Sequence, residues 1–179
     1  QIREALGLSL TQAGSAYSAQ GLGALFGAVI FGQLADRYGR RTMLMPILGG
    51  YGLMLLAGLL VSSYPQLLIQ RFVMGAFLGA SFPICVGLYV DLFDQSVRGR
   101  LASIMLAMFS LSLMVMGWTL KFVGEDWQLM LWIGGLPPVL LALLVPFVIP
   151  HLPPKPAAEG ASNLPVRELF SAGFRRWTI

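Results

Sequence analysis

Long stretches without any acidic or basic side chain are the feature that most constrains this chain. The runs free of Asp, Glu, Lys and Arg are 5–35, 42–70, 72–90, 101–120 and 127–154. A helix needs roughly 20 mostly apolar residues to cross about 30 Å of hydrocarbon. The runs do not alternate between apolar and polar residues, as the strands of a membrane barrel do. They therefore predict transmembrane helices.

Polar residues and one break set the expected limits of these helices. The first run is polar over residues 9–15, so its span is expected to begin after them. The second run breaks at Ser62-Ser63-Tyr64-Pro65, and the span that follows takes in Arg71. The expected spans are 16–34, 43–61, 66–90, 101–121 and 128–149. The predicted fold is an all-α membrane protein with five transmembrane helices.

Composition excludes several other classes of protein. Charged residues make up 11% of the chain, against about 25% in a soluble domain, so lipid is the expected solvent. The net charge of +4 does not indicate a nucleic-acid partner, because the basic residues form short clusters between apolar runs. One cysteine, Cys85, provides neither a disulfide framework nor a metal site. No phosphate-binding loop or catalytic triad is visible, so we expect no cofactor and no enzyme.

The distribution of Lys and Arg predicts the orientation in the membrane. Connections facing the cytoplasm carry an excess of these residues. One side would hold nine of them: Arg37, Arg40, Arg41, Arg98, Arg100, Lys155, Arg167, Arg175 and Arg176. The other side would hold two, Arg3 and Lys121. We therefore expect 35–42, 91–100 and the C-terminal segment to face the cytoplasm, and 1–15, 62–65 and 122–127 to face outward.

This orientation predicts the organisation of the chain. Residues 1–15 would be an outer loop, and 16–149 a transmembrane bundle. Because the first span starts outside, one more helix is expected before Gln1, so the five spans would be the second to sixth of an incomplete six-helix bundle. Residues 150–179 begin with a proline-rich stretch that is typical of a linker. Their last residues would begin a seventh helix.

A charged motif follows the first span: GQLADRYGRR, from Gly32 to Arg41. It resembles the signature loop of major facilitator transporters, G-x-L-A-D-R-x-G-R-K/R, which joins the second and third helices. Every specified position matches, in the expected place in the topology. An ordinary positively charged turn has no reason to fix two glycines and an acid at this spacing.

The resemblance assigns this motif to a cytoplasmic gating loop. Gly32 would let helices approach closely, and Gly39 would permit a tight turn. Asp36 would pair with nearby arginines or with a helix N-terminus. The basic residues Arg37, Arg40 and Arg41 would hold the loop at the anionic inner surface of the membrane.

A second pattern, Arg71-x-x-x-Gly75-x-x-x-Gly79, is similar to a feature of the family's fourth helix. Pro83 and Gly87 continue the spacing, so these residues would share roughly one slowly drifting face. Small residues on that face would allow close helix contact or leave room for a cavity. The resemblance implies a transport or coupling role for Arg71, Gly75 and Gly79.

Arg71 itself admits two interpretations. A charge inside a span is a functional candidate, because burying it in lipid is expensive. It would also lie only about 9 Å from a helix start at Pro65, at 1.5 Å per residue. A long Arg side chain can reach the interface over that distance. The matching glycines favour the first interpretation, a role in coupling or anion binding.

The same span ends in YVDLFDQSVRGR, which resembles the segment closing the fourth helix in the sugar and organic-acid branches of the family. Asp91, Arg98 and Arg100 are therefore candidate partners of the gating loop. A metal or acid–base site made of Asp36 with Asp91 or Asp94 is less favoured than charge neutralisation of the neighbouring arginines at the membrane surface.

The resemblance implies a secondary active transporter that moves a small organic anion or sugar-like metabolite together with protons by alternating access. Its partners would be the substrate, protons, the bilayer of the plasma membrane (the inner membrane in bacteria), a first helix and a second six-helix half. A drug-efflux antiporter of the same superfamily is the alternative. The fifth helix lacks the glycine- and proline-rich pattern of many such exporters, since it holds only Gly117 and no proline. A non-transporting scaffold would need neither motif.

Overall fold

The computed structural model describes residues 7–123 and 126–150. Its elements are α2 (Leu10–Tyr38), α3 (Arg40–Ala57), the 3-10 turn η1 (Gly58–Leu60), α4 (Tyr64–Leu92), α5 (Gln95–Val123) and α6 (Trp127–Val148). The five α-helices are long and apolar enough to cross a membrane, α3 together with η1, and the described ranges contain no strand. The predicted all-α membrane fold with five spans is confirmed. Of the predicted linker and helix start, 150–179, all but residue 150 lie outside the described residues.

The first helix begins earlier than the sequence suggested. α2 starts at Leu10, so residues 10–15 are helical and are not part of a loop. Ser9 is the N-cap: its hydroxyl accepts a hydrogen bond from the Gln12 backbone N–H at 3.2 Å. The Gln12 side chain in turn accepts one from the Ser9 backbone N–H at 3.0 Å. This capping box satisfies two otherwise free donors, which explains why a polar stretch can start a helix.

The predicted connections 35–42 and 91–100 are also much shorter than expected. One residue, Gly39, separates α2 from α3, and its φ of +92° favours glycine. The tight turn expected at Gly39 is confirmed. Between α4 and α5 only Phe93 and Asp94 are outside a helix. Apart from Asp94, the charged residues of both connections therefore lie in the end turns of helices, where backbone hydrogen bonds fix their positions.

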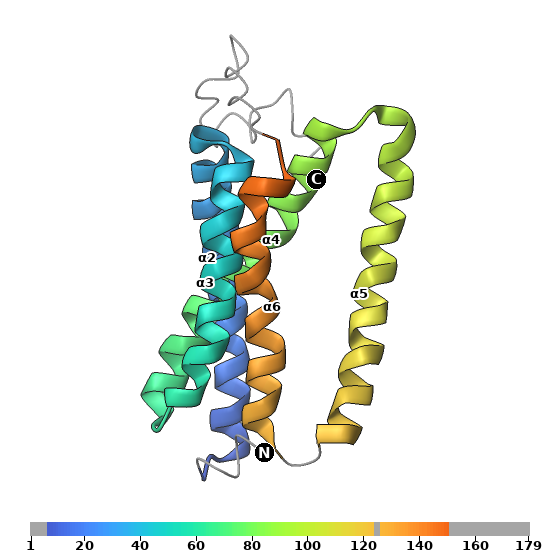
Figure 1. Ribbon diagram of the computed structural model, residues 1–179. Helices are drawn as coiled ribbons and strands as arrows, with labels where there is room; N and C mark the ends of the chain where they lie inside the picture. The colour runs from blue at the N-terminus through green and yellow to red at the C-terminus, as the bar shows by residue number, and fades with distance from the viewer. Residues whose placement is uncertain (1–6, 124–125, 151–179) are drawn as a thin grey trace, which may run out of the picture.

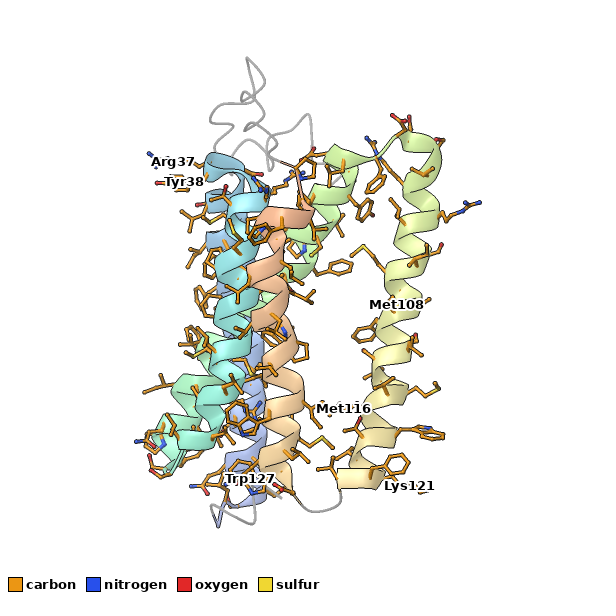
Figure 2. The ribbon with its side chains drawn as sticks, viewed as in Figure 1. Arg37, Tyr38, Met108, Met116, Lys121 and Trp127 are labelled. Atoms are coloured by element: carbon orange, nitrogen blue, oxygen red, sulfur yellow. The ribbon has the colours of Figure 1, made fainter. Side chains whose placement is uncertain are left out.

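Four helices pack together, and α5 stands apart from them (Figure 1). The C-terminal ends of α2, α4 and α6 and the N-terminal ends of α3 and α5 meet at one end of the molecule. We call it the arginine end, after Arg37, Arg40, Arg41, Arg98 and Arg100. Figure 2 shows Arg37 and Tyr38 at this end and Lys121 and Trp127 at the other. That the arginine end faces the cytoplasm stays a prediction.

Helices α2 and α4 approach each other to backbone contact. Four glycines line the contact, two from each helix: Gly23, Gly27, Gly75 and Gly79. A Cβ on any of them would overlap a backbone carbonyl oxygen of the other helix. Such close approach through small residues is a common way of packing helices in lipid, where apolar side chains gain little by leaving their surroundings.

Helices α3 and α6 pack in a related way around Gly52 and Gly135. A Cβ on Gly52 would lie 2.6 Å from the Gly135 carbonyl oxygen, and one on Gly135 would lie 3.0 Å from that of Gly52. A buried cluster near the arginine end joins both helix pairs: Ala35, Leu44, Ile47, Ala80, Ile84, Leu88 and Val145. In contrast, α5 has no buried residue, and most of its large apolar side chains are exposed.

Candidate functional site

At the arginine end, Arg40 joins the gating loop to the end of α4. Its Nη1 donates to Asp91 Oδ2 at 2.9 Å, and its Nη2 lies 3.6 Å from Asp36 Oδ1. The Asp91 side chain is 25% exposed, whereas that of Asp36 is 73% exposed. Since exposed ion pairs are weak, the shorter and less exposed Arg40–Asp91 pair is the stronger tie. The expected pairing of Asp36 and Asp91 with an arginine is observed, and a role in gating stays a prediction.

Arg41, the next residue, reaches a different helix. Its Nη2 donates to the carbonyl oxygen of Pro146 at 2.7 Å. In a continuing helix that oxygen would accept from the N–H of residue 150, but residue 150 is a proline and has none. A cation at the C-terminus of a helix is also favoured by the helix dipole. Arg41 therefore caps α6 and ties α3 to it.

Arg98 caps a helix as well. Its Nε donates to the Phe93 carbonyl oxygen at 3.0 Å, and its Nη2 donates to that of Val90 at 2.8 Å. Both carbonyl groups lie at the C-terminal end of α4, where the helix leaves its last carbonyls without partners. Arg98 forms no ion pair with a carboxylate in the described ranges and binds these carbonyl groups instead, so its expected neutralisation by a neighbouring acid stays a prediction.

Three other motif residues face outward. Arg37 is exposed, and its guanidinium carbon lies 5.5 Å from the centre of the Tyr38 ring. Arg100 is exposed and forms no ion pair with any residue in the described ranges. The close helix contact expected at Gly32 is not found, since no described atom lies within 4 Å of a Cβ added there. Gly32 follows Gly27 by five residues, which turns it about 140° away from the α2–α4 contact.

A cavity of about 920 Å³ lies between α5 and the other helices, in the half of the molecule away from the arginine end. It is lined by the N-terminal parts of α2, α4 and α6 and the C-terminal parts of α3 and α5. Its walls are mostly apolar. The polar and aromatic residues among them are Tyr17, Tyr51, Arg71, Ser112, Thr119 and Trp127. A mostly apolar cavity with a few polar groups is typical of small-molecule sites.

Arg71 is the only formally charged residue in the cavity wall among the described residues. It lies seven residues into α4, about 10 Å along the helix axis. The side chain is half-buried, and no described carboxylate forms an ion pair with it. A cation in a wall of low polarity attracts an anion more strongly than one in water would. This placement agrees with the anion-binding interpretation of Arg71, which stays a prediction.

The two glycines grouped with Arg71 have a different environment. Neither Gly75 nor Gly79 lines the cavity, and both pack against the backbone of α2. The reason is geometric: each step of four residues rotates a position by about 40° around a helix. Residues at this spacing therefore face different neighbours: Arg71 faces the cavity, Gly79 faces α2, and Gly87 faces α3. A transport role for the two glycines stays a prediction.

The sequence interpretation missed Gln70, the neighbour of Arg71. It is 7% exposed, and its Nε2 donates to the Met54 carbonyl oxygen at 2.7 Å. The available signal was an uncharged polar side chain inside an apolar run. Gln70 ties α4 to α3 and leaves the adjacent Arg71 directed to the cavity.

The sequence as a whole matches the family model described as "Major Facilitator Superfamily" over residues 1–179. The chain belongs to the major facilitator superfamily. Its members are membrane transporters and not enzymes, so the expected absence of an enzymatic role is confirmed, as is the assignment to a multi-pass integral protein of the plasma membrane.

Several transporters of this superfamily resemble the chain. It is 34% identical over 174 residues to the 3-(3-hydroxy-phenyl)propionate transporter of Escherichia coli K12, covering 95% of this chain and 42% of the relative. It is 33% identical over 147 residues to the 4-hydroxybenzoate transporter PcaK of Pseudomonas aeruginosa, covering 81% of the chain and 33% of the relative. It is 33% identical over 136 residues to the niacin transporter NiaP of Acinetobacter baylyi, covering 73% and 31%. The chain thus spans less than half the length of these relatives.

Proposed function

We propose that the protein containing this chain takes up small aromatic carboxylates together with protons, and that Arg71 binds the carboxylate. The solutes named for the three relatives support this, because each combines an aromatic ring with a carboxylic acid. In the major facilitator architecture, substrate binds near the membrane midplane between two six-helix halves, which rock against each other. This chain would supply one wall of such a site.

The position of Arg71 in the cavity wall is the observation that carries the proposal. A guanidinium group can donate two parallel hydrogen bonds to one carboxylate, which fixes orientation as well as charge. The rings of Tyr51 and Trp127 belong to the same wall and offer apolar faces for an aromatic solute. One end of the solute would therefore be recognised by charge and the other by ring contacts.

Uptake by the full-length protein tests this proposal. We expect cells that express it to accumulate radiolabelled 4-hydroxybenzoate or 3-(3-hydroxyphenyl)propionate, and an uncoupler to abolish the accumulation. Arg71→Gln should lower uptake at least about tenfold, because a hydrogen bond to a charged group contributes roughly 1.5–3 kcal/mol. Arg71→Lys should keep part of the activity, since it preserves the charge but loses the paired geometry.

Lys121→Gln is the matched control. Lys121 lies in the last turn of α5, is exposed, and does not line the cavity, so its loss removes a charge from the same end of the molecule without touching the proposed site. Equal uptake by wild type, Arg71→Gln and Lys121→Gln would show that Arg71 only anchors its helix at the interface. Uncoupler-stimulated accumulation, with extrusion in energised cells, would support the alternative, a proton-driven exporter.

A further inference from the structure

Gly87 of α4 lies directly beneath the guanidinium group of Arg40. A Cβ added to Gly87 would lie 2.5 Å from both Cζ and Nη1 of Arg40, and 2.6 Å from its Nε. Real Cβ atoms essentially never come closer than 3.0 Å to another group. The flat guanidinium therefore lies over bare backbone, at a place where any other residue would put a side chain.

The acid that binds Arg40 follows one helical turn later. Asp91 is four residues beyond Gly87, so the two positions are neighbours on the same side of α4. The Nη1 atom that a Cβ at position 87 would meet is also the donor of the 2.9 Å bond to Asp91 Oδ2. The Arg40 guanidinium therefore lies over position 87 when it binds Asp91. Glycine has no side chain to block this position.

We propose that Gly87 is a positioning residue for the Arg40–Asp91 ion pair, and through that pair for the gating loop. The Gly39 turn leads directly into Arg40, so the ion pair holds the turn between α2 and α3 against the end of α4. A side chain at position 87 displaces the guanidinium and frees this turn. The consequence for transport rate rests on the proposed function, whereas the consequence for the ion pair does not.

Gly87 differs in this respect from the other glycines of α4. At Gly75 and Gly79 a Cβ would meet backbone carbonyl oxygens of α2, which cannot yield unless the helices separate. At Gly87 it would meet the far end of a flexible side chain, which can rotate into the exposed space beside it. Gly87→Ala should therefore fold and reach the membrane at wild-type abundance, and change only the position of the Arg40 side chain.

A double-mutant cycle in the full-length protein tests the proposal. Hydrogen exchange of the backbone in segments 36–44 and 86–94 should be faster in Gly87→Ala than in wild type. In an Arg40→Ala background the same change should add nothing. Gly21→Ala is the matched control: it lies on α2, and no described atom lies within 4 Å of a Cβ added there. It should leave exchange in both segments unchanged.

Transport supplies an independent measurement. Gly87→Ala should lower the maximal rate of 4-hydroxybenzoate uptake roughly threefold to tenfold, with KM within about twofold, as expected for a modest coupling free energy. Arg40→Lys should rescue part of this loss, since a compact ammonium reaches Asp91 without a flat group over position 87.

The outcomes separate the two proposals. Equal exchange in wild type and Gly87→Ala would overturn the positioning role, as would acceleration of the same size in the Arg40→Ala background. If the exchange cycle behaves as expected while no aromatic carboxylate is taken up by the wild type, the positioning role stands and the proposed substrate fails.

Discussion

Helices α4 and α5 follow each other in the chain and have similar apolar composition, yet they are held in opposite ways. α4 contacts α2 through backbone at Gly75 and Gly79 and also packs on α3. α5 has no buried residue and carries no glycine in close contact within the described part of the chain. Hydrophobicity alone therefore does not decide where a membrane helix lies.

The difference follows from the solvent. In lipid, an apolar side chain gains little by contacting another helix, so helices associate through close packing of small residues and through polar bonds. α4 has both, because it offers glycines to α2 and the Gln70 side chain to α3. Hydroxyl groups of α5 instead donate hydrogen bonds to carbonyl oxygens of the same helix, and within the described ranges only Arg98, in its first turn, binds another helix. The described residues thus form a closely packed body of four helices, with a cavity between that body and α5.

The largest effect should come from breaking the α2–α4 contact. Gly23→Leu puts a branched side chain where even a Cβ would overlap the Phe72 carbonyl oxygen. We expect destabilisation of about 3 kcal/mol or more, because overpacking a tight contact costs roughly 1–3 kcal/mol even for smaller insertions. The measurement is thermal unfolding of the purified full-length protein in detergent, together with its abundance in the membrane.

Gly21→Leu provides the comparison two residues away on the same helix. No described atom lies within 4 Å of a Cβ there, so the leucine would contact only lipid or detergent. We expect stability close to wild type. Equal destabilisation by both substitutions would mean that α2 tolerates no bulk on either face, and that the glycine contact is not what joins α2 to α4.

A smaller effect is expected where α5 is tied to the four-helix body. Arg98→Ala removes the two hydrogen bonds that cap α4 at Val90 and Phe93. A cation at the C-terminal end of a helix contributes roughly 0.3–1 kcal/mol, so the free energy of unfolding should fall by up to about 1 kcal/mol. Arg98→Lys should recover less than half of it, because one ammonium group cannot reproduce the geometry of the guanidinium fork. If Arg98→Ala were as stable as wild type, other contacts would position α5.

Much of the fold could be predicted from the sequence, because membrane thickness limits the length of a span. The five spans were each found, and the errors fell at their ends. The helical start at Leu10 was missed because residues 9–15 were counted as polar, although Ser9 and Gln12 have the spacing of a capping box. The connections at Gly39 and at 93–94 were predicted too long, since charge marks the membrane surface and not the end of a helix.

The site was predictable only in part. The match to the signature loop identified Arg40 as a candidate, and the segment that closes the fourth helix identified Asp91. The ion pair between them is present. The carbonyl groups that Arg41 and Arg98 bind could not be predicted, because every residue has a backbone carbonyl group, whatever its side chain. The different surroundings of Arg71 and of Gly75 and Gly79 could not be predicted for a related reason. A spacing of four fixes the order of residues along a helix, but the 40° drift brings each to a different neighbour.

The smallest effect should appear at Thr119 of α5, which lines the cavity opposite Arg71 on α4. Its hydroxyl already donates to the Val115 carbonyl oxygen of its own helix at 2.8 Å, so it has no unmet donor to offer a solute. Thr119→Val keeps the shape and removes the hydroxyl. We expect a stability change within about 0.5 kcal/mol, as for surface substitutions generally. Uptake of 4-hydroxybenzoate should likewise stay within about twofold of wild type, against a large loss in Arg71→Gln.

A tenfold loss of uptake in Thr119→Val, at normal abundance, would show that α5 turns its hydroxyl to the solute during transport. The recognition proposed for Arg71 would then be shared across the cavity, and α5 would be part of the binding site.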